Sequence, residues 1–428
     1  MNESFLHYIW QHQYFKKEEL RTTGREPITI FKQGHYNTHA GPDFEQAKIK
    51  IGNLDWAGSV EIHIKSSDFL AHNHQADKAY ENVILHVVWQ DDKPLKRNDG
   101  TNMPTLELRS RVNEELVKQY RQLVNSAFQI PCSKSFGRID ELIKVSMLEQ
   151  AAITRLQAKA ALIRKTHQQT LGDWEETFYR ALAKNFGFKV NSEFFEQLAT
   201  TLPIQLIRKN SDSLLKTEAL LFGMAGFLEA AKGDAYYQSL KKEFNFLEHK
   251  FNLQASKLSK ARWRFLRLRP ANFPTVRIAQ LAQLLHKSTQ LFSEILALDD
   301  VALLRKKFSV EVSTYWQTHY SFGKESKRPH GSMGEESLEN ILINSVIPTL
   351  AAYAIEGGEE KYFNRGLVFL QKLKPESNSI IRSWNELGLK AINAFDSQGM
   401  IEQMNSFCKK RNCLNCVTGA AILKPTKL

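Results

Sequence analysis

Two segments of alternating apolar and polar residues, at 47–51 and 60–65, constrain the fold more strongly than any other feature. The sequence GNLD between them is typical of a tight turn, so the pair predicts a β-hairpin. Successive side chains of a strand point to opposite faces of the sheet. The alternation therefore places Glu61, His63 and Lys65 on one face of the second strand.

An acidic residue, Asp43, directly precedes the first of these strands and follows a Gly-Pro pair that turns the chain. If the hairpin closes as predicted, Asp43 and Glu61 converge at one end, with His63 beside them. Hard carboxylate oxygens bind Mg²⁺ or Mn²⁺, and a neighbouring imidazole or amine positions or deprotonates a water. We therefore predict a hydrolytic site in which Asp43 and Glu61 hold the ion. Either His63 or Lys65 then positions the water.

The residues around the hairpin complete a mixed sheet. An apolar run at 83–89 is interrupted only by His86 and predicts a buried central strand. We expect His86 to be a hydrogen-bonded core histidine. Further elements are expected at 3–14 (helix), 27–31 (strand), 67–69 (helix start), 105–108 (strand) and 112–128 (helix). Together they predict an α/β or α+β domain over residues 1–130.

The order helix, strand, Asp, strand, Glu-x-His, helix, strand resembles the core of the PD-(D/E)XK nucleases. Pro42-Asp43 corresponds to the PD element and Glu61-Ile62-His63 to the (D/E)XK element. His63 departs from the lysine that is usual there; it can orient a water or bind the metal directly, and Lys65 on the same face can supply the charge. The resemblance implies metal-dependent cleavage of nucleic acid.

The whole chain also resembles a domain-of-unknown-function family, DUF2851. The resemblance rests on the elements GPDF, VEIH, the paired histidines and ILHVV, and on a cysteine-rich carboxyl end. It covers nearly the full length. It implies that these residues form a coherent set, and it implies no established activity.

Two histidines between the predicted strands, His72 and His74, offer a second kind of metal site. In an extended segment they share a face and can bind a transition metal with Glu61 or His63. In a helix they diverge by about 200°, so that one faces the site and the other faces solvent. Both alternatives remain open from the sequence.

The pattern changes after residue 130, where apolar residues recur at helical spacing up to about residue 400. This predicts an all-α domain over 131–400 and a short cysteine-bearing segment, 401–428, packed back on the junction. A chain of 428 residues is longer than a single hydrophobic core usually accommodates, which agrees with two domains. No run of eighteen apolar residues occurs, so we expect a cytoplasmic protein without a membrane span.

The net charge of +12 favours polyanionic partners. Residues 257–277 concentrate arginines, with Trp263 and Phe265 between them and no acidic residue. Guanidinium groups bind phosphates and aromatic rings stack on bases, so the segment predicts a nucleic-acid-binding track. The alternative is pairing with acids of the first domain. The arginines are Arg262, Arg264, Arg267, Arg269 and Arg277.

The chain contains four cysteines: Cys132, and the close set Cys408, Cys413 and Cys416 in CKKRNCLNC. In a cytoplasmic chain such thiols predict a zinc or iron–sulfur site with a structural role, the alternative being unliganded thiols. The arrangement resembles the iron-staple nucleases, in which one remote and three carboxyl-terminal cysteines hold a 4Fe–4S cluster. Here Cys132 follows the sheet domain instead of preceding it.

These observations favour a metal-dependent phosphodiesterase acting on nucleic acid. One alternative is a protein that binds nucleic acid through the same basic surface without cleaving it. Another is a hydrolase of a small molecule, with zinc or iron held by Glu61, His63, His72 and His74.

Overall fold

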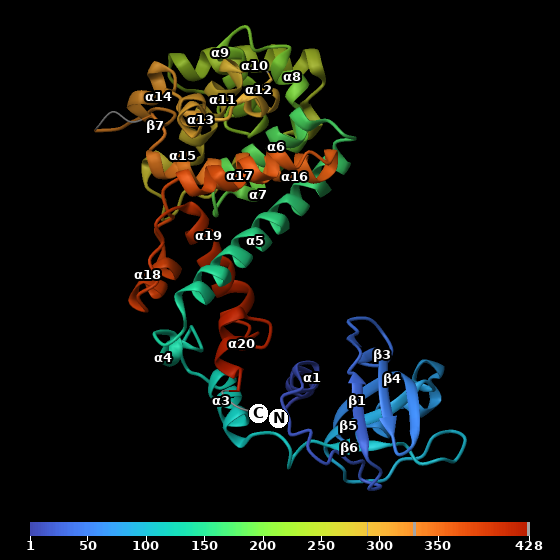
Figure 1. The fold of residues 1–428 in the computed structure, drawn as a ribbon. Coiled ribbons are helices and arrows are strands. Elements are labelled where there is room, and N and C mark those ends of the chain that lie inside the picture. Colours follow the sequence, from blue (N-terminus) through green and yellow to red (C-terminus); the bar gives the residue numbers. More distant parts are fainter. Residues whose placement is uncertain (289, 328–330, 426–428) are drawn as a thin grey trace. The chain divides into compact units, whose positions relative to one another are not determined.

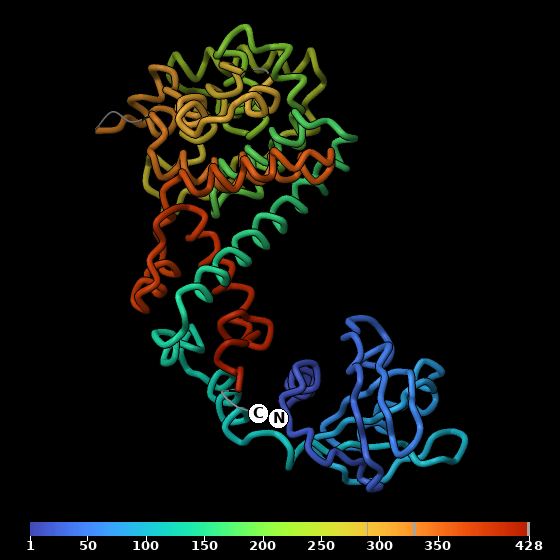
Figure 2. The backbone as a smooth tube through the Cα atoms, viewed as in Figure 1, coloured from blue at the N-terminus to red at the C-terminus, as the bar shows by residue number. Residues whose placement is uncertain are grey.

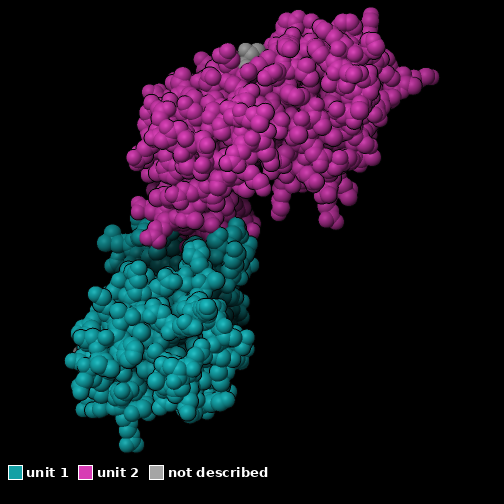
Figure 3. Space-filling view, turned by 90° about the vertical axis from the view of Figure 1, so that its right-hand side faces the viewer, with its two compact units in different colours: residues 1–147, 404–428 teal, residues 148–403 magenta. Residues whose placement is uncertain are grey.

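A mixed β-sheet followed by a long series of helices makes up the structure, a computed structural model that describes residues 1–288, 290–327 and 331–425 (Figure 1). The predicted fold class is thereby confirmed. The chain divides into two compact units, shown in different colours in Figure 3. Unit 1 comprises Met1–Met147 and Met404–Leu428, and unit 2 comprises Leu148–Gln403. The boundaries predicted from the sequence lie near residues 130 and 400.

The sheet of unit 1 has the strand order β1-β3-β4-β5-β6, with the short β2 paired to β3. Neighbours β1, β3 and β4 are antiparallel, whereas β4, β5 and β6 are parallel, so β4 lies where the two patterns meet. The strands are β1 (Ile28–Lys32), β2 (His35–Tyr36), β3 (Phe44–Ile51), β4 (Leu54–Lys65), β5 (Val83–Gln90) and β6 (Thr105–Glu107).

The predicted hairpin is confirmed: β3 and β4 pair from Ile51 opposite Leu54 across a turn at Gly52-Asn53. Gly52 has a φ of 60°, a conformation that glycine adopts without steric cost. The central strand at 83–89 is also confirmed as β5, whose residues 83–88 are all buried.

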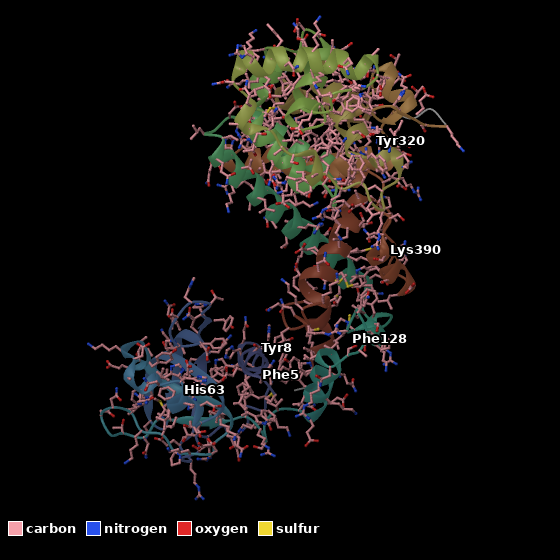
Figure 4. The ribbon with its side chains drawn as sticks, turned by 180° about the vertical axis from the view of Figure 1, so that it is seen from behind. Phe5, Tyr8, His63, Phe128, Tyr320 and Lys390 are labelled. Carbon is pink, nitrogen blue, oxygen red and sulfur yellow. The ribbon has the colours of Figure 1, made fainter. Side chains whose placement is uncertain are left out.

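Helices cover the sheet and connect its strands. The first, α1 (Glu3–His12), contacts β4, and its Phe5 stacks on Tyr120 of α3 (Glu114–Val124) with ring centroids 3.9 Å apart. Figure 4 labels Phe5 and Tyr8 on this helix. The link from β4 to the parallel strand β5 contains α2 (Asp68–Ala71), η1 (His74–Ala76) and η2 (Lys78–Tyr80). This short connection carries two of the predicted site histidines.

The carboxyl-terminal segment returns to unit 1, where α20 (Val417–Leu423) contacts α3. The smooth trace of Figure 2 shows this red segment beside the chain that follows residue 112. Along the chain, α4 (Ser133–Phe136) and the start of α5 (Glu141–Gln169) follow α3. Unit 1 is therefore assembled from both ends of the chain.

Unit 2 is helical around one large apolar core. It also contains a small hairpin of β7 (His319–Ser321) and β8 (Lys324–Glu325). Its α-helices after α5 are α6 (Trp174–Phe186), α7 (Ser192–Thr201), α8 (Ile204–Arg208), α9 (Leu214–Met224), α10 (Ala235–Phe251), α11 (Pro274–Lys287), α12 (Leu291–Ala297), α13 (Val301–Phe308), α14 (Thr314–Thr318), α15 (Glu335–Ile341), α16 (Ile347–Gly357), α17 (Glu360–Lys372), α18 (Ser379–Glu386) and α19 (Ala394–Glu402).

The helical stretch Glu335–Gly357, which runs through α15 and α16, is long and apolar enough to cross a membrane by length and composition. However, 78% of its most apolar window is buried inside the protein. Its apolar character is therefore that of a core helix. In the middle it contains a π-helical segment, η6 (Leu342–Val346).

A buried acid in unit 2 makes stability depend on pH. Glu218 of α9 is 1% exposed and accepts hydrogen bonds from Tyr236 and Ser313. Burial raises its pKa from 4.5 to about 7, so the folded state keeps a proton that the unfolded chain releases above pH 4.5. The stabilising contribution of this group is thus fully present below pH 4.5 and is lost as the pH rises through about 7.

The variant Glu218→Gln has no ionisable group at this position, so it should escape this loss. From pH 4 to pH 8 we expect its free energy of unfolding to improve relative to the parent by roughly 3 kcal/mol. Urea unfolding followed by tryptophan fluorescence at both pH values measures this. A difference between variant and parent that stays constant with pH would contradict the assignment.

Candidate metal centre

A β-bulge in β3 brings the two predicted acids together. Between the turn and Ala47, which lies opposite Gly58, β3 and β4 pair in one regular register. Beyond Ala47 the register shifts by one residue, so that Phe44 pairs with Val60. The extra residue is accommodated by Gln46, which adopts a left-handed conformation with φ 57°. One position further on, the shifted register places Asp43 opposite Glu61. Without the bulge Asp43 would lie opposite Ile62, and its side chain would be on the other face of the sheet from that of Glu61.

The predicted convergence of Asp43 and Glu61 is present in the structure. The backbone N–H of Asp43 donates to Oε2 of Glu61 at 3.2 Å, and the N–H of Ile62 donates to Oδ2 of Asp43 at 2.9 Å. The same Oδ2 lies 3.3 Å from Nε2 of His7 on α1, a neighbour that no sequence motif indicates. Asp43 therefore fixes the backbone of β4 beside Glu61 and also faces an imidazole.

Three histidines converge beside these acids. Ligand atoms of His63, His72 and His74 all lie within 4.8 Å of one another. Figure 4 labels His63 within the sheet. The segment is not extended, and His72 is exposed as expected of one of the pair, but both His72 and His74 lie beside His63. Asn73 between them is left-handed, with φ 61° and ψ 28°, and this reversal directs both imidazoles toward His63.

The donor atoms are spaced like the ligands of one ion. Nε2 of His63 lies 3.2 Å from Nδ1 of His72 and 3.7 Å from Oε1 of Glu61, and Nε2 of His74 lies 3.4 Å from the same carboxylate oxygen. Metal–nitrogen bonds of about 2.0–2.1 Å in a tetrahedron place neighbouring donors roughly 3.4 Å apart. His63 is buried, His74 is half-buried and His72 is exposed, so the cluster is open to solvent on one side.

A fourth imidazole supports the cluster from behind. His86 of β5 is fully buried, and its Nε2 lies 3.0 Å from Nδ1 of His63, in agreement with the predicted hydrogen-bonded core histidine. Histidines that bind a metal through one ring nitrogen usually donate the other N–H to a hydrogen-bond acceptor, a place that the ring nitrogen of His86 takes here. The ring of His74 stacks on that of Tyr80, with ring centroids 3.9 Å apart.

The electrostatics of the cluster favour neutral imidazoles and a bound cation. Burial, followed by the neighbouring imidazoles, lowers the pKa of His63 to about 3, and burial lowers that of His86 to about 3. Neutral nitrogens keep the lone pair that a metal needs. Burial and then Asp43 raise the pKa of Glu61 to about 9, so its charged form needs a nearby positive charge. The donor set therefore fits a divalent ion.

The remaining candidates of the sheet lie outside this group. Lys65 is exposed at the end of β4, and its backbone N–H donates to Oδ2 of Asp68. Among the residues that the structure describes, no acid forms an ion pair with its ammonium group. The structure thus places His63, and not Lys65, next to Glu61.

The predicted arginine track is exposed in part. Four of its arginines lie on the surface, and no carboxylate in the described part of the chain pairs with them: Arg262, Arg264, Arg267 and Arg269. The expectation that Trp263 lies free to stack on bases is wrong, because it is 5% exposed and its indole N–H donates to the carbonyl of Ala225. Phe265 remains half-buried at the surface.

Arg277 does not belong to this surface, which corrects the prediction. It is 4% exposed and lies over the ring of Phe188 at 4.2 Å. Its guanidinium donates to Gln280, Asn272 and Ser337. Its position in the first turn of α11 directs it into the unit, where these neutral groups accept hydrogen bonds from both of its terminal nitrogens.

All four cysteines are buried thiols that lie close together in unit 1. Burial, followed by the neighbouring thiols, raises the pKa of Cys132 to about 12 and that of Cys413 to about 11. Arg411 holds the returning segment by donating to the carbonyls of Ser126 and Cys408. Residues far apart in the sequence thus gather the thiols at one place.

Fold and site together define a class of protein: a mixed-sheet domain with an imidazole-rich cluster that can hold a metal, followed by an all-α region. The chain belongs to the family DUF2851, described as a protein of unknown function, whose model matches residues 3–379. The expected family is thereby confirmed. No curated protein and no solved structure matches the chain.

Metal content tests the cluster directly. We expect His72→Ala and His74→Ala each to lose one equivalent of zinc or another transition metal per chain relative to the parent, because each removes a donor. Inductively coupled plasma mass spectrometry of the purified proteins measures this. His39→Ala, which changes an exposed loop histidine, is the matched control and should retain the metal. Equal metal content in all four proteins would contradict the site.

Proposed function

We propose that this protein is a metal-dependent phosphodiesterase that acts on nucleic acid, with a transition metal bound by His63, His72 and His74. The observation that carries the proposal is the convergence of these three donors within 4.8 Å of one another, with Oε1 of Glu61 3.7 Å from His63 and 3.4 Å from His74. Imidazole ligands favour zinc or iron over magnesium. The metal therefore differs from the carboxylate-bound Mg²⁺ or Mn²⁺ that the two acids predict from the sequence, while the hydrolytic role is retained.

Each residue near the ion has a distinct role in this proposal. The bound metal would supply Lewis acidity and make a water more acidic. Glu61, which lies beside His63 and His74, accepts the proton of the attacking water. Asp43 positions Glu61 through its backbone N–H, and His86 holds the ring of His63. The exposed side of His72 leaves room for a substrate.

Two further observations support nucleic acid as the substrate. The element order α1, β1, β3, β4, α2, β5, with Asp43 before β3 and Glu61-x-His63 on β4, is the order expected from the PD-(D/E)XK resemblance. The net charge of +12 and the four exposed arginines favour a polyanion. A hydrolase of a small molecule would use the same histidines and would not need this basic surface.

Activity measurements test the proposal. With Zn²⁺ or Mn²⁺, the parent should cleave a labelled oligonucleotide and bis(p-nitrophenyl) phosphate. Loss of a general base typically lowers a rate by about 10²–10⁴-fold, which we expect for Glu61→Gln. His74→Ala should remove the metal-dependent rate altogether.

Lys65→Gln is the matched control, since it changes an exposed residue of the same strand and should retain activity. Cleavage of the small ester without cleavage of any oligonucleotide would favour the small-molecule hydrolase. Salt-sensitive binding of oligonucleotides without hydrolysis of either substrate would favour a protein that binds nucleic acid without cleaving it, and would end the proposal.

We further propose that the four cysteines bind an iron–sulfur cluster, which suits a reduced, cytoplasmic protein. Tetrahedral zinc with Zn–S bonds of about 2.3 Å places its sulfurs roughly 3.8 Å apart. Within the described residues, however, the donor group with all atoms inside 4.8 Å contains histidines and no thiols. A cluster interposes several iron and sulfide atoms between its thiolates, so it fits a more widely spaced ligand set.

Anaerobic purification should therefore yield a brown protein with broad absorption near 400 nm and about four irons per chain. Cys413→Ser should lose this absorption, because one ligand is removed, whereas the histidine variants should retain it. Iron analysis and the visible spectrum measure the outcome. Zinc in place of iron, lost in the same cysteine variant, would contradict the cluster.

A further inference from the structure

A concave surface in unit 2 is lined by aromatic rings from four separate segments. This aromatic pocket has a volume of about 550 Å³ and is lined chiefly by Phe227, Tyr237, Phe265, Phe273, Tyr320 and Phe322. Figure 4 labels Tyr320 near the small hairpin of β7 and β8. Its residues belong to unit 2, so the pocket does not depend on unit 1.

The rings of the pocket pack edge to face and hold one another in place. Phe273 lies at the centre, with its ring centroid 5.0 Å from that of Phe265 and 5.6 Å from that of Tyr320, both T-shaped. Phe265 in turn lies edge-on to the buried Phe227 at 6.2 Å. Phe265, Phe273 and Tyr320 are half-buried, so the pocket presents them to solvent in fixed orientations.

The charged residues around these rings are almost entirely cationic. Lys232, Lys260 and Lys324 line the pocket and are exposed, and no acid of the described chain pairs with them. Among the described lining residues Asp234 alone is acidic, and it is occupied: it accepts from the N–H of Tyr237, from Tyr315 and from the N–H of Gly323. It also begins helix α10 as its cap. The pocket thus offers free ammonium groups beside aromatic faces.

The exposed arginine segment continues this surface. Phe265, a wall of the pocket, lies between Arg264 and Arg267, and Lys260 precedes Arg262 by two positions. The aromatic wall and the arginines therefore belong to one stretch of chain.

We infer that the aromatic pocket binds an unpaired base of single-stranded nucleic acid, with the flanking phosphates on the surrounding lysines and arginines. The inference rests on the proposed function and deepens it by naming the form of its substrate. Every base presents a flat face that stacks on aromatic side chains, and cationic side chains follow the backbone. A base in a duplex is stacked inside the helix and cannot enter a concave pocket. An apolar peptide would make no use of three unpaired lysines.

Fluorescence anisotropy of the full chain tests this inference. The parent for the comparison is Glu61→Gln, whose lowered rate should leave the probe intact during the measurement. The probes are a labelled thymidine oligonucleotide and a duplex of the same length, each at several salt concentrations. We expect the single strand to bind more tightly than the duplex.

Two variants probe the two parts of the pocket. Phe265→Ala combined with Tyr320→Ala should weaken binding of the single strand about tenfold or more, because stacking surfaces are removed. Lys260→Gln combined with Lys324→Gln changes exposed residues only, so it should leave the fold intact. This lysine variant should make the negative slope of log affinity against log salt shallower, by about 0.7 for each phosphate that it no longer neutralises. Circular dichroism checks the helical content of both.

Phe246→Ala is the matched control, since Phe246 is 61% exposed on α10 and lies outside the pocket lining. It should bind as the parent does. Unchanged binding in both pocket variants, or duplex binding as tight as that of the single strand, would overturn the inference. Binding as expected with no hydrolysis by the wild-type protein would support the pocket and overturn the proposed function. Hydrolysis of the small phosphodiester without oligonucleotide binding would support the metal centre and overturn the pocket.

Discussion

Burial of two ionisable side chains on one strand is the constraint on which the candidate site depends. Glu61 and His63 are 4% and 2% exposed in β4, so neither can be solvated by water. An unsatisfied buried polar group costs roughly 1–3 kcal/mol. The surrounding structure meets this cost with the N–H of Asp43 for Glu61 and with His72 and His86 for His63. Helix α1, the bulge and the link between β4 and β5 all contribute to that environment.

The sheet was predictable from the sequence because alternation and apolar runs follow from burial on one face or two. The shared face of Glu61 and His63 follows from the same rule. The bulge was not predictable, since Gln46 has no special preference for the left-handed conformation that it adopts. The reversal at Asn73 carries a local signal, because asparagine tolerates that conformation better than most residues. That signal would have indicated that His72 and His74 face the same way.

In the helical unit, the charge pattern of the sequence does not predict which arginines are exposed. Arginines within one short segment differ completely in environment: Arg262 is exposed over Phe194, whereas Arg277 is buried over Phe188. Composition cannot distinguish them, because the difference comes from neighbours in other helical segments that are remote in sequence. The aromatic pocket has the same origin. The rings of Phe265, Phe273 and Tyr320 come together only in the tertiary fold, so no local sequence motif predicts the pocket.

The histidine cluster and the four cysteines of unit 1 differ in chemistry, and each suits a different kind of metal site. Imidazole nitrogens open to solvent on one side suit an ion that exchanges ligands during a reaction, whereas four buried thiols suit a closed structural site. The thiols also occupy a particular place in the chain path, since the chain leaves unit 1 at Met147 and re-enters it at Met404. Joining Cys132 to Cys408, Cys413 and Cys416 closes a very long loop, whose closure entropy is removed from the unfolded chain when the site is filled. The proposed cluster would therefore stabilise the return of the carboxyl end to the sheet-containing unit.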